Sequence, residues 1–173
     1  LAVPGFLGFE ALRTIVECGK NVVDISFSPE NVLSLNDLAK KNNVCAVVDA
    51  GVAPGIPNFL LGYWDSKMKV DSFDYLVGGL PKNPLPPYNY KAPFSPIDVI
   101  EEYTRPARMM INSKIVTKPA LSEIEKLDII DAGKLEAFNT DGLRSLLITM
   151  DHIPNMKEKT LRYPGHAALI QSM

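Results

Sequence analysis

Three side chains in the last third of the chain are of types that can bind ions or transfer protons. Arg162 carries a planar guanidinium, which can make paired hydrogen bonds with a carboxylate. His166 has a side chain that titrates near neutral pH, so it could act as a general base. Asp141 could accept hydrogen bonds from an ammonium group. Each has a plainer alternative, namely an internal ion pair for Arg162, a structural role for His166 and a helix cap for Asp141.

Three segments rich in glycine, proline or serine follow short apolar runs in the first part of the chain. They span residues 3–6, 26–29 and 51–55. In parallel sheets, ligands bind at the loops that leave the carboxyl ends of the strands. We therefore expect the three loops to lie together at one edge of a sheet and to form a binding surface. The alternative is that they are ordinary turns.

The elements that must position these loops alternate between helix and strand. The predicted order is a helix over residues 8–18, a strand over 21–26, a helix over 35–41, a strand over 44–48 and a helix over 56–64. Ser34 suits the cap of the second helix. The continuous apolar run of the second strand predicts that both of its faces are covered. The alternation is typical of a parallel sheet with helices on its faces.

From about residue 70 the pattern changes to short strands and helices around a proline-rich segment. Residues 81–96 hold six prolines, which predicts a rigid loop or, alternatively, a wall that faces a substrate. The other predicted elements are a strand over 73–80, a helix over 98–103, strands over 109–111, 114–118 and 134–139, a helix over 142–150 capped by Thr140 or Asp141, a strand or loop over 160–163 and a helix over 165–173. We expect an α+β domain with a mainly antiparallel sheet.

Composition and charge narrow the class of protein. Apolar residues make up 46% and charged residues 22% of the 173 residues, and the net charge of −2 gives no pull toward nucleic acid or an anionic membrane. No apolar stretch approaches the roughly 20 residues that cross a bilayer. Cys18 and Cys45 form no CxxC motif, so we expect no metal site. We expect both to be buried, reduced thiols. Reduced thiols favour a cytoplasmic location. The first residues are typical of the interior of a longer chain.

Five short motifs, in order along the chain, resemble the saccharopine dehydrogenase family. The segments VPGFLG (3–8), VVDISF (22–27) and VDAGVAPG (48–55) are similar to strand ends and loops of the family's dinucleotide-binding domain. The segments KLEAFNTDGLRSL (134–146) and TLRYPGH (160–166) are similar to its lysine 6-dehydrogenase branch. The resemblance covers essentially the whole chain, although the family's Gly-x-Gly-x-x-Gly motif is absent from this sequence.

The resemblance implies an α/β fold and an oxidoreductase. Residues 1–66 would be the C-terminal part of a Rossmann-type parallel sheet, and residues 67–173 a substrate-binding and dimerisation domain, with the option that the last helix returns to the first domain. The cofactor would be NAD or NADP. The reaction of the closest branch is oxidative deamination of L-lysine at the ε-carbon to 2-aminoadipate 6-semialdehyde. The alternatives are a saccharopine-type or other opine-forming reductase, and a non-catalytic dimerisation remnant.

The resemblance also assigns roles to individual residues. The expected cofactor-binding residues are Pro4, Gly5, Ser26, Val52, Ala53 and Pro54. The expected substrate-binding residues are Phe6, Tyr90, Phe94, Ser95 and Arg162, and His166 and Asp141 are the catalytic candidates. Ser95 lies where related reductases carry an arginine, which favours a small amine as substrate. Arg144 ranks below Arg162 because its helix face is expected to be solvated or at an interface. The resemblance also implies a homodimer. Residues 109–111 and the last helix could provide the apolar surface of its interface.

Overall fold

The computed structural model describes all 173 residues and divides the chain into two compact units. Unit 1 comprises Leu1–Lys69 and Arg144–Thr149, and unit 2 comprises Val70–Leu143 and Met150–Met173. The sequence analysis expected a single boundary after residue 66, with residues 144–149 in the second domain. None of the helices combines the length and the apolar character needed to cross a membrane.

Unit 1 is built around a small parallel sheet. Its elements are α1 (Gly5–Glu17), β1 (Val22–Val23), the 3₁₀ helix η1 (Val32–Leu35), α2 (Asn36–Lys41), β2 (Ala46–Val47), α3 (Ile56–Asp65) and α5 (Leu146–Thr149). β1 pairs with β2 in parallel, with Val22 opposite Ala46. The first residues run beside β1, because the Ile25 N–H donates to the Leu1 carbonyl at 3.0 Å.

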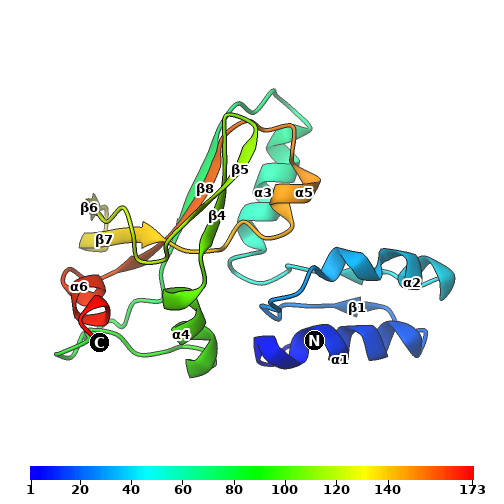
Figure 1. Cartoon of the computed structure of the whole chain (residues 1–173), viewed down its shortest axis with the longest axis horizontal. Coiled ribbons are helices and arrows are strands. Elements are labelled where there is room, and N and C mark those ends of the chain that lie inside the picture. Colours follow the sequence, from blue (N-terminus) through cyan, green and yellow to red (C-terminus); the bar gives the residue numbers. More distant parts are fainter. The chain divides into compact units, whose positions relative to one another are not determined.

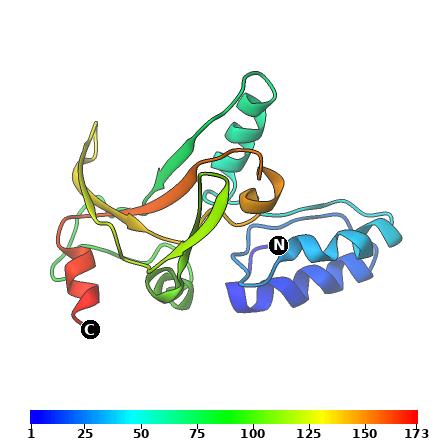
Figure 2. The ribbon, with the colours of Figure 1, turned by 45° about the horizontal axis from the view of Figure 1, so that its top comes forward.

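The core of unit 1 lies on one face of this sheet. Leu12 and Val16 of α1 are buried with Val32, and apolar residues of α2 and both strands pack against them. Figure 2 shows α1 and α2 lying side by side. The other face is open, since Val23 is 57% and Val47 is 40% exposed. The prediction of a strand covered on both faces is therefore wrong for β2, because helices cover only one face here.

Two local predictions in unit 1 are corrected by its hydrogen bonds and burial. α2 has Leu35 at its N-cap and no side-chain cap bond, so Ser34 does not cap it. Asn31 caps the preceding η1, where its Oδ1 accepts from the Leu33 N–H at 3.1 Å, and the Ser34 hydroxyl donates to the Asn31 carbonyl. Cys18 and Cys45 are both exposed rather than buried. Cys18 follows the last turn of α1, and Cys45 precedes β2, so neither side chain reaches the core.

Unit 2 contains a six-stranded sheet and two helices. Its elements are β3 (Phe73–Val77), α4 (Pro96–Thr104), β4 (Ala107–Ile111), β5 (Lys114–Lys118), β6 (Glu125–Ile129), β7 (Gly133–Asn139), β8 (Met156–Arg162) and α6 (His166–Gln171). The strand order is β5-β4-β8-β7-β6, and β3 pairs with β8 (Figure 1). The expectation of a mainly antiparallel sheet is confirmed, with β3–β8 as the parallel pair.

Part of the core of unit 2 lies where α4 and α6 pack on the sheet. Phe138 of β7 is buried against Tyr103 of α4 and Ala167 of α6, so both helices pack on this part of the sheet. Met109 and Met110 are 3% and 4% exposed. The prediction that the strand over residues 109–111 offers an apolar surface to a partner is therefore wrong for its two methionines, because both are buried within the chain.

Candidate active site

The three predicted loops meet in unit 1. The Ser26 hydroxyl accepts a hydrogen bond from the Val3 N–H at 3.3 Å. Gly8 of α1 lies so close to the second loop that an added Cβ would be 2.1 Å from the Ser28 hydroxyl oxygen and 2.9 Å from the Ser26 Cβ. An added Cβ on Gly51 would lie 3.7 Å from the Ile25 side chain. The expected common edge of strand-end loops is therefore present.

The predicted cofactor-binding residues are spread over this edge in different environments. Pro4 is the N-cap residue of α1, and Gly5 is its first, buried residue. Ser26 is buried, whereas Val52 is 71% exposed. Ala53 and Pro54 complete the turn between Gly51 and Gly55, whose φ is 147°. Only glycine fits there, because an added Cβ on Gly55 would lie 1.9 Å from the Gly51 carbonyl oxygen.

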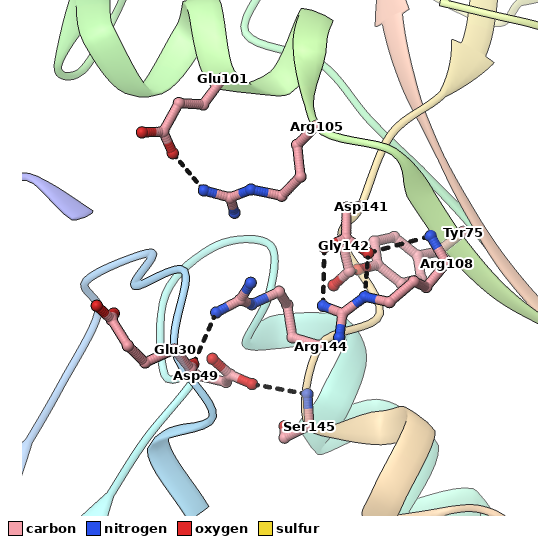
Figure 3. Close-up of polar contacts among 10 residues, drawn as sticks. All are labelled: Glu30, Asp49, Tyr75, Glu101, Arg105, Arg108, Asp141, Gly142, Arg144 and Ser145. Carbon is pink, nitrogen blue, oxygen red and sulfur yellow. Dashed lines mark hydrogen bonds and ion pairs between the residues drawn. The ribbon is translucent and has the colours of Figure 1, made fainter. Parts of the chain in front are cut away.

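Two buried carboxylates hold the backbone of unit 1. Asp24 Oδ1 accepts from the Ser26 N–H at 2.9 Å, so it stabilises the second loop. Asp49 Oδ2 accepts from the Ser145 N–H at 3.1 Å (Figure 3). The Asp49 donor comes from a segment that is 96 residues away along the chain. This bond anchors residues 144–149 in unit 1.

Arg144 is the cation that the structure brings to the loops. Its guanidinium carbon lies 4.7 Å from the centre of the Phe27 ring, in the second strand-end loop. Its Nη2 donates to the Glu30 carbonyl at 3.4 Å (Figure 3). Arg144 is 8% exposed and has a φ of 50°, a conformation that costs energy for a residue with a Cβ. The expectation of a solvated position on a helix is therefore wrong.

Arg162 lies in unit 2 and is surrounded by groups of that unit. Its Nη2 pairs with Glu102 Oε2 at 3.0 Å, and its Nε donates to the Tyr103 hydroxyl at 3.2 Å. Its guanidinium also lies 4.1 Å from the centre of the Tyr90 ring. Burial raises the pKa of Tyr90 to about 12, although the nearby Arg162 charge opposes that shift. The structure thus favours the internal ion pair over a substrate carboxylate as the partner of Arg162.

His166 belongs to the same group of side chains. Its Nε2 lies 2.9 Å from the Tyr103 hydroxyl, and its Nδ1 lies 2.8 Å from the Tyr88 carbonyl oxygen. Burial lowers the pKa of His166, and the Arg162 charge lowers it further against the opposing Tyr88 hydrogen bond. Both ring nitrogens therefore have partners within unit 2, which favours the structural alternative for His166.

The remaining substrate candidates are more exposed. Phe6 in α1 is 61% exposed and Phe94 in the proline-rich segment is 48% exposed. Ser95 is the N-cap residue of α4 without a side-chain cap bond. Side chains of this kind leave room for a ligand but do not by themselves identify one.

Asp141 is held by Arg108 and does not cap a helix. Arg108 donates from Nε to Asp141 Oδ1 at 2.9 Å and from Nη2 to Oδ2 at 2.8 Å (Figure 3). The hydrogen bond with Asp141 raises the pKa of Arg108. The predicted helix over residues 142–150 is reduced to four residues, Leu146–Thr149. Asp141 is thus a partner of Arg108 within unit 2.

Glu158 is a buried carboxyl group that the sequence did not reveal. It is 3% exposed, and the Thr140 hydroxyl donates to its Oε2 at 2.6 Å. Burial raises the pKa of Glu158 to about 7, against the opposing Thr140 hydrogen bond. Its position in β8 offered no signal, because Lys157, Glu158 and Lys159 read as an exposed charged run.

Comparisons with known proteins agree with this fold. The family model of the saccharopine dehydrogenase C-terminal domain matches residues 51–173. The chain is 23% identical over 171 residues to the mitochondrial alpha-aminoadipic semialdehyde synthase of Mus musculus, in an alignment that covers 90% of this chain and 18% of that protein. It matches the fold of the apo histidine-tagged saccharopine dehydrogenase (L-Glu forming) from Saccharomyces cerevisiae with a TM-score of 0.65 at 20% identity, over 98% of this chain and 41% of that one.

The chain therefore spans less than half of the length of either relative. The structural likeness shows the fold, and the family model extends over more than half of the chain. On these grounds the chain belongs to the saccharopine dehydrogenase family.

Proposed function

We propose that this chain is part of an NAD(P)-dependent oxidoreductase that acts on the amine of an amino acid, with L-lysine as substrate and the ε-carbon as the site of oxidation. In such a reaction a hydride leaves that carbon for the nicotinamide, and water hydrolyses the resulting imine to 2-aminoadipate 6-semialdehyde and ammonia. The mouse relative is named as an alpha-aminoadipic semialdehyde synthase, which supports a semialdehyde of this kind as the product.

The observation that carries the proposal is the meeting of the three strand-end loops in unit 1. Ser26, Gly8 and Val3 are in contact across the first two loops, and Gly51 approaches Ile25. The carboxyl ends of parallel strands are where dinucleotide cofactors bind in this class of sheet. This arrangement of strand-end loops supports the proposal that one edge of unit 1 receives the nicotinamide end of the cofactor.

The residues present fit the nicotinamide end of such a cofactor. Gly5 and Gly51 permit close approach to the backbone, and the exposed side chains of Phe6 and Val52 offer apolar surface to a flat ring. The chain has no Gly-x-Gly-x-x-Gly segment to receive the pyrophosphate. We therefore assign only the ring end to these loops.

Arg144 provides the cation for a substrate carboxylate in this proposal. It lies beside the second loop of unit 1, over the Phe27 ring. Arg162 lies in unit 2, where it pairs with Glu102. A guanidinium can make two parallel hydrogen bonds with a carboxylate. The strained φ of Arg144, at 50°, is the kind of backbone conformation that is found at functional sites.

The complete protein is expected to reduce NAD or NADP when L-lysine is added. The measurement is the absorbance of the reduced nicotinamide, recorded with L-lysine and with saccharopine in separate reactions at equal concentration. A signal with lysine supports the proposal. A signal with saccharopine alone would assign the protein to the saccharopine-type alternative, and no signal with either would contradict the oxidoreductase proposal.

A further inference from the structure

The turn Thr140–Gly142 carries the chain from unit 2 to the segment Arg144–Thr149, which belongs to unit 1. Groups of unit 2 hold this turn at every residue. The Tyr75 hydroxyl donates to the Gly142 carbonyl at 2.7 Å, and Arg108 binds Asp141. The Thr140 hydroxyl and the Gly142 backbone N–H both form hydrogen bonds with Glu158.

Glu158 and Gly142 are in unusually close contact. A Cβ added to Gly142 would lie 2.6 Å from the Glu158 Cγ, Cδ and Oε2 atoms, so only glycine fits against this carboxyl group. Glu158 therefore lies directly against the turn whose residues it binds.

The hydrogen bond between Glu158 and the Thr140 hydroxyl can run in either direction, whereas the Gly142 N–H can only donate and lowers the pKa of Glu158 against the larger effect of burial. Thr140 Oγ1 lies 2.6 Å from Glu158 Oε2 and 2.8 Å from Thr160 Oγ1. When the carboxyl group is protonated, it can donate to Thr140, which in turn donates to Thr160. The protonated group therefore satisfies its neighbours without placing a charge in the interior.

No cation contacts the carboxyl group itself. Tyr75 lies opposite it in β3, and Asp141 lies in the turn with its charge paired to Arg108 of β4. Glu102 of α4 is paired with Arg162, which belongs to β8 itself. Both Glu102 and Asp141 raise the pKa of Glu158, after burial as the largest cause. An ionised Glu158 is therefore left among carboxylates whose counterions are already engaged.

We propose that Glu158 is a proton-operated latch on the turn Thr140–Gly142, closed while the carboxyl group is protonated and released when it ionises. Opening of the turn admits water and returns the carboxyl group to its ordinary acidity. Ionisation therefore favours the open turn in the window between the ordinary pKa of 4.5 and the raised pKa of about 7. The latch does not depend on the proposed reaction.

The test is amide hydrogen exchange of Gly142 as a function of pH, corrected for the intrinsic exchange rate. In the wild-type chain the opening constant is expected to rise by up to about tenfold per pH unit between pH 5 and pH 7. In Glu158→Gln the side-chain amide reproduces the protonated group, so the opening constant should not change with pH. Asp74→Asn is the control, because this carboxylate of β3 pairs with Lys157 at the surface.

Two results would overturn the latch. One is a wild-type opening constant that is flat with pH or has the same slope as that of Glu158→Gln. The other is a rise shared equally by the Phe138 amide in the core of β7, which would assign the proton to global stability. A carboxyl carbon titration of wild-type Glu158 by NMR adds a measurement that needs no variant, with a midpoint near 7 expected and a midpoint near 4.5 contradicting the proposal.

Discussion

Arg162→Ala is expected to lower the free energy of unfolding by about 3–5 kcal/mol. The substitution removes a side chain that is 3% exposed and leaves Glu102 without its ion-pair partner. Burial raises the pKa of Glu102, and the charge and hydrogen bond of Arg162 oppose that shift. Without Arg162, the ionised Glu102 would therefore destabilise the folded state. Chemical denaturation followed by far-ultraviolet circular dichroism measures the loss.

Lys157→Ala is the matched control for this prediction. Lys157 lies on the same strand, but its ion pair with Asp74 is 3.3 Å long and exposed, so the expected effect is within about 0.5 kcal/mol. Replacing both partners, Arg162 by Met and Glu102 by Leu, should recover much of the stability because no unpaired charge remains. If Arg162 instead bound the substrate carboxylate, Arg162→Ala would leave the stability nearly unchanged and would mainly raise KM.

Phe138→Ala is expected to cost about 3–5 kcal/mol of unfolding free energy. The ring is fully buried in β7, and its centre lies 6.2 Å from the centre of the Tyr103 ring. Ala167 and Ile170 of α6 pack against the same cluster, so the cavity would lie where both helices meet the sheet. The midpoint of urea unfolding should fall, with the slope unchanged.

The control for the cavity is Ile130→Ala, because Ile130 is 89% exposed after β6. Its effect is expected to stay within about 0.5 kcal/mol. An equal loss of stability in the two variants would contradict the assignment of Phe138 to the core of unit 2.

Local patterns along the chain were sufficient for much of the fold. The helical spacing of Leu12 and Val16 predicted α1, and the apolar run around Ala46 and Val47 predicted β2. The strand β6 was missed because only Leu127 and Ile129 of its five residues are apolar, and two alternating positions are too few to separate a strand from a charged loop. Strands of this kind gain their stability from pairing, here with β7, which no local window reveals.

The site was harder to predict because long-range contacts decide it. The spacing of Leu143, Leu146 and Leu147 indicated a helix from residue 142, yet the positive φ of Arg144 interrupts that helix. The interruption is supported by the bond between Asp49 and the Ser145 N–H. Residue types alone could not show that Arg162 pairs with Glu102 in unit 2 or that Arg144 lies over the Phe27 ring in unit 1.

The sequence also predicted that the strand-end loops lie near one another in unit 1. Gly8, Ser26 and Val3 meet as parallel-sheet topology requires. The roles of His166 and Asp141 stay predictions, and both residues now have named partners in unit 2, Tyr103 and Arg108.

The central claim, that Arg144 beside the strand-end loops binds the carboxylate of an amino-acid substrate, is tested most directly by the KM of the complete protein for L-lysine. Arg144→Ala is expected to raise KM at least about tenfold, from the loss of a charge-assisted hydrogen bond, with kcat changed much less. Arg144→Lys should recover part of the affinity, since the charge returns without the paired geometry. An unchanged KM in Arg144→Ala, in a protein that still folds and reduces the cofactor, would contradict the account.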